Sequence, residues 1–170
     1  YLYNGGHIVL FPDVESETSE LSNINKITSN IAINYIDLEK KSLSEISFQE
    51  IDPVSVQIND IQELFGHADK KGRNIRIFNY IPLPFHAEVS KIQLKNGAPI
   101  WNRHAIHSGI LDVFGFAVNL NWTNFPIKGT FLPFTHFLLY SHAANKETLY
   151  RNTGDPWNHI LSEYYEQTIY

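Results

Sequence analysis

Large apolar residues recur at every second position between residues 108 and 122, and this alternation constrains the fold more than any other feature of the sequence. The even positions from Ile110 to Trp122 are mostly bulky, whereas the odd positions are smaller and mixed in character. Side chains alternate between the two faces of a β-strand, so this period predicts one long, largely buried strand. A helix could also be drawn through the segment, but its two glycines and its aromatic residues favour the strand.

Shorter alternating segments predict further strands and therefore a β-rich domain. They lie at residues 31–35, 46–49, 54–58, 75–81, 86–95 and 131–140. Asn96-Gly97 is the strongest hairpin signal, because both residues tolerate the positive φ of a type I′ turn. Residues 66–74 are predicted to form a loop, since they combine glycine with charged residues.

The end of the chain predicts a helix. Asp155 is a suitable N-cap and Pro156 suits the first helical position. The residues that follow form an apolar stripe at positions i, i+3, i+4 and i+7: Trp157, Ile160, Leu161 and Tyr164. The sequence therefore predicts a β-rich α+β fold, in which an antiparallel sheet, sandwich or barrel-like arrangement carries a C-terminal packing helix.

Length and composition limit the classes of protein that fit. The 170 residues predict a single globular domain over 1–170, with an acidic leader at 1–30 that includes a short helical pattern. The chain has no Cys, which excludes disulfides, thiolate zinc sites and cysteine nucleophiles. It also has no Met, which predicts a fragment or a processed product. No apolar run approaches the roughly 20 residues of a membrane-spanning helix.

The charge distribution bears on the kind of partner. The net charge is −5, with an excess of eight acidic side chains in residues 1–65 and of three basic ones in residues 66–170. An acidic total argues against nucleic-acid binding, which needs a basic surface. A protein or glycan partner is expected instead, with self-association as a further option. Without cysteine or a catalytic motif, an extracellular or surface protein is slightly favoured over a cytosolic one.

Asp112 is the first candidate for a catalytic residue. Its alternation places it among bulky apolar side chains, where an ionised carboxylate is costly unless it is paired. It could be an acid of raised pKa or a metal ligand, but also a strand-end residue in water or the partner of an arginine. His104 lies on the same face if the strand extends back that far, and His136 belongs to the next predicted strand. His104, Asp112 and His136 are therefore the predicted catalytic set, and they could hold one divalent metal ion such as zinc or iron.

Ligand binding is the alternative role for polar and aromatic residues near these strands. Trp101 and Trp122 flank the long strand and lie near several asparagines, a combination that suits a sugar. Arg73 and Arg76 belong to the main basic cluster and could bind an anionic ligand. Both sets also have a structural interpretation: the two tryptophans could belong to the core, and the two arginines could belong to an ordinary charged loop.

Two functions from different classes follow from these patterns. The sequence contains no G-x-S-x-G, H-E-x-x-H, P-loop or G-x-G-x-x-G motif. We therefore expect a non-catalytic binding or structural module that needs no cofactor. The alternative is a hydrolase-like domain with a His and carboxylate site, in which Asp112, His104 and at least one of His136, His86 or Glu88 would converge in one cleft.

Overall fold

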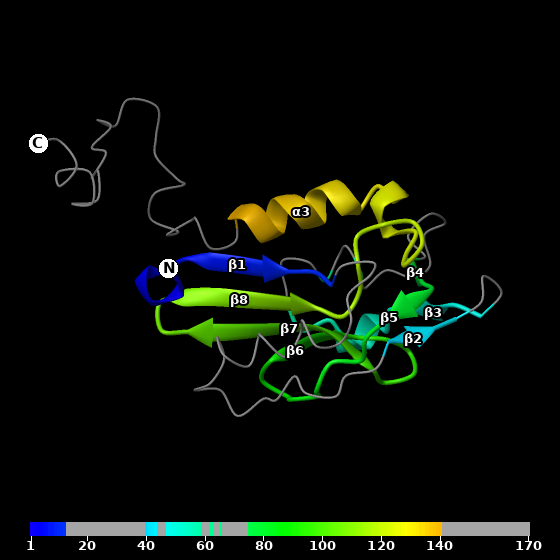
Figure 1. The fold of residues 1–170 in the computed structure, drawn as a ribbon, viewed down its shortest axis with the longest axis horizontal. Coiled ribbons are helices and arrows are strands. Elements are labelled where there is room, and N and C mark those ends of the chain that lie inside the picture. Colours follow the sequence, from blue (N-terminus) through cyan, green and yellow to red (C-terminus); the bar gives the residue numbers. More distant parts are fainter. Residues whose placement is uncertain (13–39, 44–46, 59–61, 63–64, 66–74, 141–170) are drawn as a thin grey trace, which may run out of the picture.

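The computed structural model describes residues 1–12, 40–43, 47–58, 62, 65 and 75–140. A four-stranded sheet in the order β1-β8-β7-β6 forms its centre, and helix α3 lies along this sheet (Figure 1). Two small sheets, β2-β5 and β3-β4, lie toward one end of the molecule (Figure 1). The strands are β1 (His7–Leu10), β2 (Lys41–Ser42), β3 (Gln49–Glu50), β4 (Arg76–Ile77), β5 (Asn79–Tyr80), β6 (Ser90–Gln93), β7 (Pro99–Ile106) and β8 (Gly109–Phe114). The described helices are η1 (Leu2–Asn4), η3 (Pro53–Ser55), η4 (Phe125–Ile127) and α3 (Phe131–Tyr140).

Strands β7 and β8 form an antiparallel hairpin whose register sets the two faces of the sheet. Trp101 is paired with Phe114, and the pairing continues to Ile106 and Gly109. The two residues between the strands make the turn, and His107 there has a φ of 52°. Paired residues share a face, so Trp101, Arg103, Asp112 and Phe114 lie on one side of the sheet.

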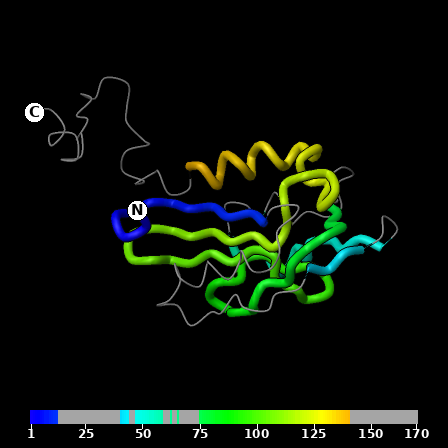
Figure 2. Tube along the Cα trace, in the orientation of Figure 1, coloured from blue at the N-terminus to red at the C-terminus, as the bar shows by residue number. Residues whose placement is uncertain are grey.

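Strand β1 extends this hairpin in the parallel direction. His7–Leu10 pairs with Ile110–Val113, although about a hundred residues separate them in the chain (Figure 2). The sequence predicts an antiparallel sheet; β6, β7 and β8 are antiparallel, and β1 makes the sheet mixed because it runs parallel to β8. The first residues of the predicted acidic leader form η1 and β1.

The long strand predicted over residues 108–122 is much shorter in the structure. Strand β8 ends at Phe114, and turns follow. At Gly115 the chain meets the backbone of Ile81, whose N–H donates to the Gly115 carbonyl at 2.7 Å. A Cβ at Gly115 would lie 2.2 Å from the Ile81 carbonyl oxygen, so this close crossing requires glycine. Beyond it the alternating residues lie in a loop, where Phe116 and Trp122 are buried and Leu120 is exposed.

Residues 131–140 form helix α3, so the strand predicted there is wrong. Phe134 and Leu138 are buried four residues apart, which is the spacing of one helical face. Pro133 fits because it lies in the first turn, where backbone N–H groups have no partner within the helix. A run of apolar residues without a polar alternation does not distinguish a buried strand from a helix.

Four shorter strand predictions also need correction. Residues 53–55 form η3 rather than a strand, because the Asp52 side chain accepts a hydrogen bond from the Val54 N–H. The strand predicted over 86–95 is limited to β6, and the one over 75–81 is divided into β4 and β5. Of the strand predicted over 46–49, residue 49 begins β3, residues 47 and 48 precede that strand, and residue 46 lies outside the described residues. The predicted hairpin at Asn96-Gly97 joins β6 to β7, but only Gly97 takes a positive φ, of 83°, so the turn is not type I′.

The aromatic core lies between the sheet and α3. The Trp101 ring stacks on Phe114 at 5.1 Å between centroids, and Phe134 meets both rings edge-on at 5.5 and 5.8 Å. The described part is therefore mostly β-sheet with a packing helix and is not a closed barrel, as a β-rich α+β fold requires. Within that part, no helix is both long and apolar enough to cross a membrane.

Several predicted elements fall outside the described residues. These are the helical pattern of the leader, the strand at 31–35, the loop at 66–74 and the helix that begins near Asp155.

Candidate functional site

Asp112 lies at the centre of a cluster built by three neighbouring strands. Its side chain is fully buried on β8. From β7, Arg103 donates to both carboxylate oxygens, through Nε at 2.8 Å and Nη2 at 2.7 Å. Trp101 Nε1, also on β7, donates to Oδ1 at 2.7 Å, and His7 Nε2 on β1 lies 2.7 Å from Oδ2. The structure therefore confirms the sequence-based alternative that Asp112 is paired with an arginine.

These contacts determine the ionisation of Asp112. Burial alone would raise the pKa of its carboxyl group, but the hydrogen bonds from Arg103, His7 and Trp101 and the Arg103 charge together lower it. The group is thus held as a carboxylate rather than as the neutral acid that a raised pKa would give. Its two oxygens accept hydrogen bonds from four donor atoms, so the Asp112 carboxylate on β8 acts as an anionic anchor that binds side chains of β1 and β7.

Helix α3 covers the same cluster from above the sheet. The Arg103 guanidinium carbon lies 5.1 Å from the centroid of the Phe137 ring and 5.3 Å from that of Trp101. A guanidinium between aromatic rings gains cation–π attraction, which is larger where water is excluded. Arg103 therefore links the buried carboxylate to the helix.

His104 lies on the opposite face of the sheet from Asp112. Its register partner is Leu111, and its neighbour Arg103 is the residue that faces Asp112. The predicted shared face of His104 and Asp112 requires residues 107 and 108 to continue a strand, whereas these two residues form the turn between β7 and β8. Burial is the largest influence on the His104 ring and lowers its pKa from 6.5 to about 4, so the ring is neutral at neutral pH.

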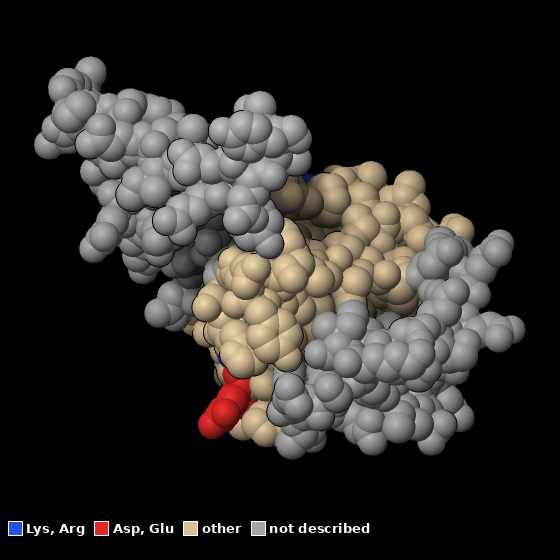
Figure 3. Space-filling view, turned by 60° about the vertical axis from the view of Figure 1, so that its left-hand side comes forward, with Lys and Arg blue, Asp and Glu red and all other residues tan. Residues whose placement is uncertain are grey.

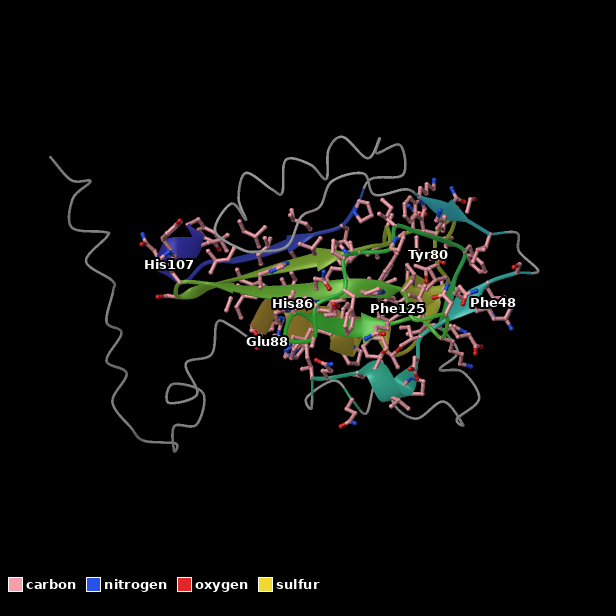
Figure 4. The ribbon with its side chains drawn as sticks, turned by 90° about the horizontal axis from the view of Figure 1, so that it is seen from below. Phe48, Tyr80, His86, Glu88, His107 and Phe125 are labelled. Atoms are coloured by element: carbon pink, nitrogen blue, oxygen red, sulfur yellow. The ribbon has the colours of Figure 1, made fainter. Side chains whose placement is uncertain are left out.

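The remaining histidine candidates lie apart from one another. His136 is exposed on α3, with its ring 4.4 Å from that of Tyr140. His86 and Glu88 are exposed beside β6, while His107 lies at the far tip of the β7–β8 turn (Figure 4). Over the described ranges, no three His, Cys, Asp or Glu residues are grouped so that they could hold a metal ion. The predicted set of His104, Asp112 and His136 is not brought together.

The predicted ligand-binding residues have different environments. Trp101 and Trp122 are 0% and 1% exposed, so neither ring presents a surface to a ligand. The Lys40 ammonium lies 4.5 Å from the centroid of the Trp122 ring. Arg76 is exposed on β4, where its guanidinium lies 4.3 Å from the Phe48 ring centroid. Arg73 lies outside the described residues.

Sequence reasoning missed Arg103 and His7 as partners of Asp112. A signal for Arg103 was present, because it is the only Lys or Arg between Lys95 and Lys128. A tight turn at residues 107 and 108 would have placed it opposite Asp112. His7 gave no such signal, since the parallel pairing of β1 with β8 joins distant parts of the chain.

The outward face of α3 is the second feature of functional interest. The helix FLPFTHFLLY carries no charged residue. Leu132, Leu139 and Tyr140 are 75%, 71% and 54% exposed, and His136 lies between them on the same face. We call these four residues the α3 stripe. Beside the start of the helix, Ile127 of η4 is 71% exposed.

Comparison with known proteins identifies no family for this chain. No protein-family description matches the sequence, and no curated protein matches it either. Among solved structures, the fold is similar to the cytoplasmic protein STM1381 from Salmonella typhimurium LT2, with a TM-score of 0.49 and 14% sequence identity. The match covers 83% of this chain and 54% of that protein, so the chain spans about half of its length. A similarity of this extent carries no argument about function.

Proposed function

We propose that this chain is a non-catalytic binding module that pairs with a second copy of itself through the α3 stripe. The observation that carries the proposal is the exposure of Leu132 and Leu139, at 75% and 71%, on a helix without charge. A helix that is apolar on all sides is expected to be covered on all sides. One side of α3 already packs on the sheet through Phe134 and Leu138, so the stripe is the side that a partner would cover.

A second copy suits this surface for an electrostatic reason. A two-fold interface uses the same surface patch on both copies, so a charged patch would face an identical patch of the same sign and be repelled by it. The stripe contains no Asp, Glu, Lys or Arg, and two copies can therefore approach there despite the net charge of −5. On the face drawn in Figure 3, most of the visible described surface is neither acidic nor basic, and its acidic atoms gather at the lower margin.

The Asp112 cluster supports a non-catalytic role. A catalytic acid or nucleophile needs access to substrate, whereas this carboxylate is fully buried and accepts four hydrogen bonds within the protein. Its lowered pKa also opposes the proton donation expected of a general acid. The cluster instead fixes the sheet under α3 and so presents the stripe on a rigid support.

The pairing is tested with the double variant Leu132→Glu/Leu139→Glu, using light scattering after size exclusion over a range of concentrations. We expect the unmodified protein to shift from monomer to dimer as its concentration rises, and the double variant to stay monomeric with an unchanged circular dichroism spectrum. Facing carboxylates in a desolvated interface repel one another, which is the reason for the expected loss.

The matched control is Val54→Glu, because Val54 is 89% exposed on η3, away from α3. This variant should dimerise as the unmodified protein does. A protein that is monomeric at every concentration, or a double variant that still dimerises, would refute the pairing.

A further inference from the structure

A pocket of about 380 Å³ lies where β2, β4 and β5 meet the loop that leads to Trp122, toward the end of the molecule that carries the small sheets (Figure 1). Leu43, Phe78 and Leu120 supply its apolar walls, and Arg76, Asn79 and Asn121 supply its polar groups. The volume falls at the small end of the range of ligand sites, roughly 300–1,000 Å³. It therefore suits one or two sugar rings or a molecule of similar size.

Hydrogen bonds hold the two sides of the pocket together. The Phe78 N–H donates to the Trp122 carbonyl at 2.7 Å, and the Asn79 amide donates to the Asn121 carbonyl at 2.7 Å. On the same side, the Arg76 N–H donates to Asn124 Oδ1 at 2.8 Å. The polar groups are thus carried by backbone whose position is fixed before a ligand arrives, which lowers the entropic cost of binding.

Among the described residues, the charged side chain that lines the pocket is a cation, although the whole chain is acidic. Arg76 is the only charged residue of the lining, and in the part of the chain that the structure describes no carboxylate pairs with it. Its cross-strand neighbour Glu50 lies instead against Lys95, with Oε2 and Nζ 2.5 Å apart. Lys40 adds a second cation beside Trp122, the residue that follows Asn121. This arrangement favours an anionic ligand.

We propose that this pocket binds a small carbohydrate that carries a carboxylate, such as a uronic acid. The planar guanidinium of Arg76 matches a carboxylate through two parallel hydrogen bonds. The amides of Asn79 and Asn121 offer donors and acceptors for hydroxyl groups, and the apolar walls fit the C–H faces of a sugar ring. A bare inorganic anion would use only the first of these three contacts.

The pocket and the α3 stripe share no residue. Binding of a carboxylated sugar therefore does not depend on the proposed pairing, and the monomeric variant Leu132→Glu/Leu139→Glu should bind the sugar as the unmodified protein does.

The experiment is a titration of the protein with digalacturonate, followed by amide NMR shifts and by calorimetry. We expect saturable shifts at residues 76–79 and 120–121, and a loss of affinity of about tenfold in Arg76→Gln, since a charge-assisted pair is removed. The methyl ester of digalacturonate should bind the unmodified protein about tenfold more weakly than the acid, for the same reason. Lys128→Gln, which removes a cation from the C-cap of η4 and not from the pocket, should leave the affinity unchanged.

Inorganic phosphate separates a sugar site from a simple anion site. The proposal is overturned if phosphate binds as tightly as digalacturonate, if the methyl ester binds as tightly as the acid, or if digalacturonate causes no saturable shift. Thermal melts of Arg76→Gln establish that a lost affinity is not a lost fold. Arg76→Lys tests the geometry of the contact. It keeps the positive charge but lacks the two parallel N–H donors of the guanidinium, so it should bind digalacturonate more weakly than the unmodified protein does.

Discussion

Asp112 keeps its charge inside the sheet because its two oxygens accept hydrogen bonds from Arg103, Trp101 and His7. Each partner would in turn lose its acceptor if the carboxylate were absent. A buried ion pair contributes little relative to a well-packed apolar pair, but removal of one partner leaves an uncompensated charge. The Arg103 side chain is only 15% exposed, so water cannot readily replace its partner.

We therefore expect Asp112→Asn to lower the free energy of unfolding by about 3–5 kcal/mol, because it leaves the Arg103 charge buried without its counter-charge. Chemical denaturation at neutral pH measures this loss. The matched control is Glu50→Gln, which removes the carboxylate of a more exposed pair with Lys95 and should cost less than about 1 kcal/mol. Similar losses in the two variants would show that the cluster is not the anchor described.

The residues around Asp112 also show what a single sequence can reveal. Its burial and its pairing with an arginine were within reach of the alternation pattern, because both follow from the apolar neighbours of a carboxylate. The side of the sheet on which His104 lies could not be predicted in the same way. The turn at His107 changes which residues of β7 share a face with Asp112. A shift of one residue moves every side chain of a strand to the other face.

At the scale of elements, α3 shows how tertiary packing decides between a strand and a helix. The segment 131–140 satisfies both patterns, since its apolar residues recur at spacings of two and of three to four. The helix allows Phe134 to contact Trp101, Phe114 and Phe125 at once. Those partners lie on other elements, so the choice depends on contacts that the local sequence does not contain. The β1–β8 pairing was beyond prediction for the same reason.

The two faces of α3 should respond differently to truncation. We expect Phe134→Ala to cost about 3–5 kcal/mol, since it opens a cavity among aromatic rings in a side chain that is 2% exposed. Leu132→Ala, on the exposed stripe, should change the stability of the monomer by less than about 0.5 kcal/mol. Urea denaturation at a protein concentration where only monomer is present measures both. Equal costs would contradict the assignment of the inner and outer faces.

At the scale of the whole molecule, the two buried ionisable groups on opposite faces of the sheet predict how stability depends on pH. Both pKa values are lower in the folded state than in the unfolded chain. A lower folded pKa means that the unfolded chain binds more protons over the interval between the two values, so stability falls as the pH falls. For His104 that interval runs from 6.5 to about 4, and for Asp112 it begins at 3.8 and continues to lower pH.

We therefore expect acid to destabilise the protein in two successive steps. The His104 step amounts to about 3 kcal/mol if the whole shift is realised, since one pKa unit corresponds to about 1.4 kcal/mol. Denaturation midpoints from pH 8 down to well below pH 3.8 should show that His104→Gln flattens the upper step and leaves the lower one, which Asp112→Asn removes. His136→Gln is the control, because that ring is exposed on α3 and its loss should leave both steps intact. If the upper step persists in His104→Gln, a different histidine causes it. The buried His104 ring would then not be the group that makes the stability of the protein depend on pH in this range.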